Sequence, residues 1–191
     1  MPASPDRLSS GGGGCGGLTA EALVAGKPVR LEKHEAVFEF YGAVEEAELH
    51  LAKARLRLEE RGLDELATLA GRLQEYTRLL PHLLALGAVD EDIVEGLRGI
   101  LGSLPRPGGW LLAGCGGEEE VELGLASTLL RRADRLLSRM AAEGLAPARL
   151  AEQLSSVASM ISDALYRMRW LLCSGRAWSP GARAAATVTH V

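Results

Sequence analysis

Apolar residues recur at intervals of three and four along most of the chain between residues 35 and 172. This spacing is typical of amphipathic α-helices, which gather their apolar side chains on one face. It predicts helices over about 35–61, 64–86, 90–104, 118–142 and 147–172, with Asp90 as the N-cap of the third. Strand signals are missing, and residues 1–30 are interpreted as loop. The expected fold is therefore all-α, an up-and-down five-helix bundle over 31–173, preceded by a glycine-rich segment (1–30) and followed by a mobile tail (174–191).

The expected core follows from the same periodicity. In the first helix the apolar stripe comprises Val37, Tyr41, Val44, Leu49, Leu51, Leu56 and Leu58. In the fourth it comprises Leu123, Ala126, Leu130, Ala133, Leu137 and Met140. Gly42 interrupts the first helix, and a glycine inside a helix indicates close approach by another group.

Composition narrows the class of protein. The chain has 191 residues, 47% of them apolar, and a net charge of -4, which fits one globular domain and argues against a nucleic-acid binder. No apolar stretch is long enough to span a membrane, and a cytoplasmic protein is expected. The cysteines are few, odd in number and far apart, and are expected to be reduced, with those at 115 and 173 buried: Cys15, Cys115 and Cys173. The histidines lack metal-ligand spacing and are interpreted as single surface or loop residues: His34, His50, His82 and His190.

A cluster of arginines lies on the fourth helix, on the side away from its apolar stripe: Arg131, Arg132, Arg135 and Arg139. A solvated face is one explanation. The other is an anion site, because guanidinium groups grip phosphate oxygens with forked geometry.

Several segments, taken in order, resemble the PduO-type ATP:cob(I)alamin adenosyltransferases. They are "GGCGGLT", "RLEK" with "VFEFYGAVEEAEL", "WLLAGCGG", "ASTLLRRADR" and "SMISDALY". The resemblance implies a homotrimer with its active sites between neighbouring subunits. It also implies that cobalt(I) of a corrinoid substrate attacks the ribose 5′ carbon of ATP and displaces triphosphate, with Mg²⁺ carried by ATP and not held by direct protein ligands. A reductase is a possible partner, whereas nucleic acid and membrane are not expected as partners.

The resemblance also implies roles for individual residues. ATP would be bound by Gly14, Gly17, Thr19, Lys33, Arg131, Arg132 and Asp134. Arg131 and Glu39 would be the catalytic residues, and Trp110 and Tyr166 would contact the corrinoid. Glu45, Arg135 and Asp163 would have structural or intersubunit roles.

Several positions depart from the family pattern, and three of them fall at residues that the family uses in its site. Cys15 stands at an aspartate, Ser127 at an arginine and Ser159 at an asparagine. A divergent enzyme could hold triphosphate with backbone amides of the glycine-rich segment together with Lys33 and Arg131. Alternatively, the chain could keep the bundle and bind nucleotide or corrinoid without turnover, or be a helical adaptor whose match to the family is accidental.

Overall fold

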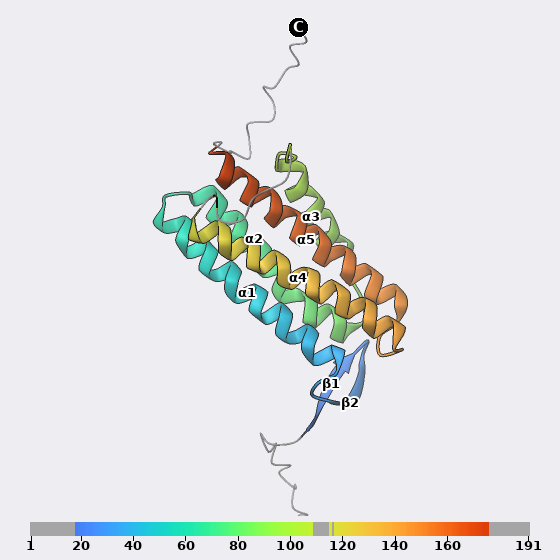
Figure 1. Ribbon diagram of the computed structural model, residues 1–191. Coiled ribbons are helices and arrows are strands. Elements are labelled where there is room, and N and C mark those ends of the chain that lie inside the picture. Colours follow the sequence, from blue (N-terminus) through green and yellow to red (C-terminus); the bar gives the residue numbers. More distant parts are fainter. Residues whose placement is uncertain (1–17, 109–114, 116, 176–191) are drawn as a thin grey trace, which may run out of the picture.

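The computed structural model describes residues 18–108, 115 and 117–175. In chain order its elements are β1 (Thr19–Val24), β2 (Lys27–Glu32), α1 (Ala36–Glu60), α2 (Asp64–Leu86), α3 (Glu91–Ser103), α4 (Glu118–Ala142) and α5 (Ala148–Ser174). Figure 1 shows the helices side by side, with the two strands at one end. The prediction of a mostly helical chain is confirmed, and each expected helix agrees with the observed bounds to within two residues.

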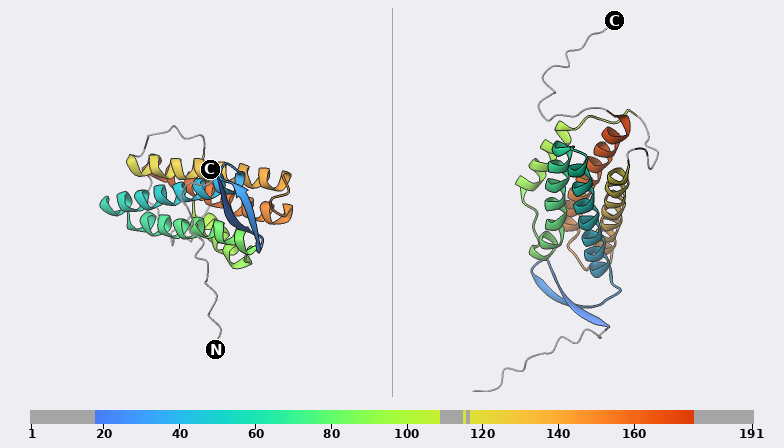
Figure 2. Two further views of the ribbon diagram at one scale, coloured as in Figure 1. Left: turned by 90° about the horizontal axis from the view of Figure 1, so that it is seen from below. Right: turned by 90° about the vertical axis from the view of Figure 1, so that its left-hand side faces the viewer.

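Helix α4 lies between α1 and α5 and makes most of the contacts that hold the bundle together. Helix α2 packs against α1 and α5, and α3 packs against α5 (Figure 2). All six residues of the predicted α4 stripe are completely buried. No helix in the described part of the chain has the length and apolar character that crossing a membrane requires.

The predicted stripe of α1 is only partly right. Val37, Val44, Leu51 and Leu58 are seven residues apart and at most 1% exposed. Leu49 and Leu56, which were also expected in the core, are 65% and 51% exposed. Of the five remaining buried positions of this face, one is Phe40 and the other four carry alanine: Ala36, Ala43, Ala47 and Ala54. Alanines allow α1 to approach its neighbours closely, and the two leucines are left outside.

The prediction that residues 19–30 form a loop is wrong. β1 and β2 pair antiparallel, from Thr19 opposite Glu32 to Val24 opposite Lys27. The turn between them consists of Ala25 and Gly26, both with positive φ (49° and 75°), as a type I′ hairpin turn requires. The sequence signal is weak because an alanine occupies the position where asparagine or aspartate usually marks this turn.

The hairpin is attached to the end of α2 through its turn. The backbone N–H groups of Ala25 and Gly26 donate to the carbonyls of Leu84 and Ala85, at 2.9 and 2.8 Å. The last carbonyl groups of a helix have no hydrogen-bond partner within that helix, and these two bonds satisfy two such groups of α2. The Tyr41 hydroxyl, on α1, donates to the Leu23 carbonyl at 3.3 Å. The hairpin therefore has a fixed position on the bundle, which two isolated strands would not provide.

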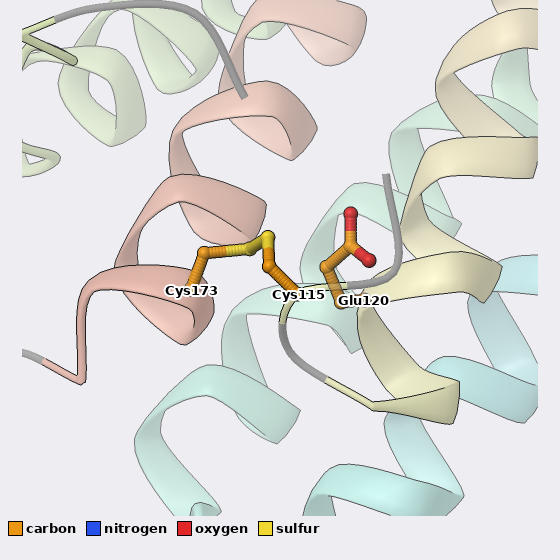
Figure 3. A group of neighbouring side chains, drawn as sticks. All are labelled: Cys115, Glu120 and Cys173. Atoms are coloured by element: carbon orange, nitrogen blue, oxygen red, sulfur yellow. A yellow bond between two sulfur atoms is a disulfide. The ribbon is translucent and has the colours of Figure 1, made fainter. Parts of the chain in front are cut away.

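A disulfide joins Cys115, just before α4, to Cys173, near the end of α5 (Figure 3). The prediction of buried, reduced thiols is wrong for these two residues. They are 58 residues apart in sequence, yet their Cα atoms are 5.1 Å apart because α4 and α5 pack together. Closing a loop of this length stabilises the folded chain by about 4 kcal/mol in the chain-entropy model.

Candidate functional site

A cavity of 710 Å³ lies between α4 and α5. Helix α4 contributes Leu130, Arg131 and Asp134. The other lining residues are on α5 or follow α3: Ala158, Ser159, Ser162, Asp163, Tyr166 and Pro107. Four residues that the sequence predicted for the site therefore meet here, namely Arg131, Asp134, Asp163 and Tyr166. The cavity combines apolar walls with a few polar groups, as ligand pockets usually do.

Arg131 is the cation of this cavity. Its Nε donates to the Ser162 hydroxyl at 3.4 Å. Among the described residues, no carboxylate forms an ion pair with Arg131. The guanidinium can therefore accept an anionic ligand without first losing a carboxylate partner.

The two carboxylates of the cavity are held by neighbouring groups. Asp134 accepts a short hydrogen bond from the Ser155 hydroxyl. Asp163 pairs with Arg167 at 2.6 Å, and Arg167 also donates to the Leu101 carbonyl at 2.9 Å. Asp163 thus positions an arginine that connects α5 to α3.

A second group of predicted residues lies on the opposite flank of α4. Arg132 pairs with Glu39 of α1 at 3.2 Å, and Arg139 lies 4.0 Å from the other oxygen of the same carboxylate. Consecutive residues of a helix point about 100° apart, so Arg131 faces α5 while Arg132 faces α1. Within one chain, the predicted catalytic pair Arg131 and Glu39 is therefore divided between two flanks.

The other predicted residues that the structure describes do not line the cavity. The Thr19 hydroxyl accepts from Arg30 at 3.2 Å within the hairpin, and Lys33 is exposed just after β2. Glu45 and Arg135 are exposed on α1 and α4. A Cβ built on Gly42 meets no atom within 4 Å, so the described residues of this chain do not make the close approach that was expected there. Gly14, Gly17 and Trp110 lie outside the described residues, as does Cys15.

Ser127 departs from the family pattern, which carries an arginine at this position. Its side chain is 1% exposed, and its hydroxyl lies 2.8 Å from that of Ser162 on α5. The pair links α4 to α5 beneath Arg131. The sequence shows that Ser127 replaces an arginine of the family pattern. It does not predict the contact with Ser162, because periodicity does not show which helix lies opposite.

The first turns of α4 contain a set of buried glutamates whose partners the sequence did not reveal. Glu119 and Glu120 are 3% and 0% exposed and pair with Arg61 and Arg169. Acidic residues in the first turn of a helix complement its dipole, and that role does not require burial. The ion pairs with α1 and α5 allow these charges to lie inside the protein.

Glu122 is the third buried glutamate of this set. Its contact with His50 changes the interpretation of that histidine. His50 Nδ1 lies 2.6 Å from Glu122, and Lys53 Nζ lies 2.5 Å from its other oxygen. His50 is therefore on a helix and paired, not a single surface or loop residue. Burial acts to raise the pKa of Glu122, but the hydrogen bonds from His50 and Lys53 outweigh it and lower the pKa below its usual value.

Comparison of the whole chain with protein-family models and with curated proteins found no match. The functional assignment consequently depends on the chemistry of the α4–α5 cavity and on the sequence blocks that meet there.

Proposed function

We propose that the chain is an ATP:corrinoid adenosyltransferase, which transfers the adenosyl group of ATP to the cobalt(I) of a corrinoid and releases triphosphate. The observation that carries the proposal is the α4–α5 cavity, in which Arg131 lies without a carboxylate partner among the described residues beside Asp134, Asp163 and Tyr166. The family resemblance assigns substrate contacts to Arg131, Asp134 and Tyr166 and a structural or intersubunit role to Asp163.

The chemistry makes few demands on the protein. Cobalt(I) is itself a strong nucleophile, so no side chain needs to act as a general base. The protein has to align the two substrates and stabilise the negative charge of the leaving triphosphate. Arg131 suits the second task, and the aromatic ring of Tyr166 offers an apolar surface to a corrin ring. Mg²⁺ would enter with ATP.

We further propose an up-and-down bundle that assembles as a homotrimer with shared sites. Exposed apolar residues on two adjacent helices support an assembly: Leu49 and Leu56 on α1, and Val121 and Leu125 on α4. An apolar surface of this kind, lying on packed neighbours, is typical of a protein–protein contact. Open space around Gly42 on α1 would allow another subunit to approach closely.

A second candidate is a trimer of the same kind that binds nucleotide or corrinoid without turnover. The specific observation in its favour is that Arg132 and Glu39 pair with each other in this chain at 3.2 Å. In that state the Glu39 carboxylate is directed to an arginine and not to a metal–nucleotide complex. The cytoplasmic location and a reductase partner remain predictions under both candidates.

The test is to supply the pure protein with Mg-ATP and chemically reduced cobalamin and to measure adenosylcobalamin and triphosphate. We expect both products in equal amounts from the wild type and none from Arg131→Ala. Arg149→Ala is the matched control, because this arginine is also exposed but lies at the start of α5, away from the cavity.

Binding measurements separate the two candidates. Calorimetry with Mg-ATP and with cobalamin should detect both ligands if the chain is an enzyme. Binding without product would favour the second candidate. If neither ligand binds to folded wild-type protein, both candidates are wrong.

A further inference from the structure

The end of the bundle opposite the hairpin brings two sulfur atoms and a buried carboxylate together (Figure 3). The sulfurs of Cys115 and Cys173 and a carboxylate oxygen of Glu120 all lie within 4.8 Å of one another. Glu120 is completely buried, whereas Cys115 is exposed and Cys173 is half-buried. The three residues come from the segment before α4, the first turn of α4 and the end of α5, and none of them lines the α4–α5 cavity.

We propose that this cluster is a redox-exchangeable metal site. When the Cys115–Cys173 disulfide is reduced, the two thiolates and Glu120 bind a zinc-type divalent ion. The disulfide and the metal are then alternative links between the start of α4 and the end of α5. This inference is independent of the proposed adenosyltransferase activity.

The geometry requires little movement. A tetrahedral zinc ion with bonds to sulfur of about 2.3 Å holds two thiolates about 3.8 Å apart. The Cα atoms are already 5.1 Å apart, and rotation of the two cysteine side chains can open the sulfurs to that separation. A carboxylate oxygen of Glu120 lies within 4.8 Å of both sulfurs, so a small shift of its side chain would make it the third ligand, and the fourth position would be taken by water, as in open zinc sites.

Charge favours the same assignment. Arg169 donates to Glu120 from Nε at 2.7 Å and Nη2 at 2.5 Å, and its own side chain is only 15% exposed. With the disulfide formed, the Glu120–Arg169 pair is neutral. With two thiolates and a divalent ion added, the net charge of the cluster is again zero. A carboxylate has about four lone-pair sites, so it can accept from a guanidinium and bind a metal at the same time.

The exchange between the two states is chemically balanced. A dithiol reductant gives two electrons and two protons to the disulfide and itself becomes a disulfide. Metal binding then releases the two thiol protons, because only thiolates are ligands. In the reverse direction, hydrogen peroxide accepts two electrons from the thiolates and two protons from the buffer acid, which yields the disulfide, two water molecules and the free ion. Thiolate ligands favour zinc over magnesium or calcium.

The experiment uses the full chain with Cys15→Ser, which removes the third cysteine. Cobalt(II) is titrated into the oxidised and the reduced protein, and tetrahedral cobalt–thiolate absorption is recorded before zinc is added to displace it. We expect one ion per reduced chain, none per oxidised chain, and no response to magnesium. Zinc should also raise the melting temperature of the reduced protein, because it binds the folded state.

Variants assign the ligands. Cys115→Ser and Cys173→Ser, which both leave the Glu120–Arg169 pair in place, should abolish the absorption. Glu120→Gln should weaken binding about tenfold or more, the size of loss that removing even an outer partner of a metal ligand causes. Glu119→Gln is the matched control, since it removes a neighbouring buried carboxylate that pairs with Arg61 and should leave metal affinity unchanged.

Three results would overturn the proposal. The first is folded, reduced protein that binds no cobalt or zinc, and the second is binding that survives in the two cysteine variants. The third is equal affinity of Glu120→Gln and Glu119→Gln, which would remove Glu120 from the site. If Glu120→Gln does not fold, Cys173→Ser decides alone, because retained binding there contradicts a two-thiolate site.

Discussion

Gly87 is the residue on which the attachment of the hairpin to α2 can be tested most directly. It ends α2 with φ of +82°, a left-handed conformation that glycine adopts at no steric cost. A Cβ built there would lie 2.9 Å from the Cα of Ala25 and 3.3 Å from its Cβ. The Gly87→Ala substitution therefore has two effects, strain in its own backbone and collision with the hairpin turn.

The two effects can be estimated separately. A non-glycine residue in the left-handed region costs about 1 kcal/mol. Moving the turn would also break the hydrogen bonds from Ala25 and Gly26 to Leu84 and Ala85, each worth about 1 kcal/mol net. We expect Gly87→Ala to lower the free energy of unfolding by about 3 kcal/mol, and the melting temperature by roughly 6–12 °C for a chain of this size.

Gly62→Ala is the matched control. Gly62 follows α1 with φ of +68°, and a Cβ built there meets no atom within 4 Å. Only the conformational cost of about 1 kcal/mol applies at that position. Denaturant unfolding of the two variants beside the wild type measures the difference. Equal destabilisation by the two substitutions would show that the turn does not contact α2 as described.

Two further predictions concern charge and assembly. Because the pKa of Glu122 is lowered below its usual 4.5, its contribution to stability is present above that pH and is lost as the pH falls through the lowered value. The unfolding free energies of wild type and Glu122→Gln should therefore converge as the pH falls below 4.5, and a difference that does not change with pH would contradict the His50–Glu122–Lys53 network. Leu56→Asp should reduce the solution mass from trimer to monomer while leaving the helical circular dichroism unchanged. Leu86→Asp, at an exposed position on α2, should not; a monomeric wild type would refute the proposed assembly.

The helices could be predicted from sequence because each depends on its own periodicity. The α4 stripe from Leu123 to Met140 repeats every three or four residues, and packing needs nothing more to select its buried face. The buried face of α1 is harder to predict, because both alanines and leucines occur around that helix. Periodicity cannot decide whether Leu49 or Ala47 faces a neighbour, and the close approach of α4 favours the smaller residue.

Features that depend on distant residues could not be predicted. The hairpin is stabilised by the end of α2 and by Tyr41, neither of which is visible in its own twelve strand residues. Three cysteines allow several pairings, and only the packing of α4 on α5 selects Cys115 with Cys173. The burial of Glu119, Glu120 and Glu122 likewise depends on cations from the end of α1, from α5 and from α1 itself: Arg61, Arg169 and Lys53.

The predicted site residues are divided between the two flanks of α4. The proposed activity therefore depends on the proposed assembly. The described residues that line the cavity come from α4, α5 and the segment after α3, whereas Thr19 and Lys33 belong to the hairpin region and Glu39 lies toward α1. Among the described residues, one chain therefore does not bring Thr19, Lys33 and Glu39 together around Arg131. If ATP is held by all of these residues, those of the hairpin and α1 have to come from a neighbouring subunit. A Leu56→Asp monomer should then lose adenosyl transfer although its own cavity is intact, and a fully active monomer would refute a shared site.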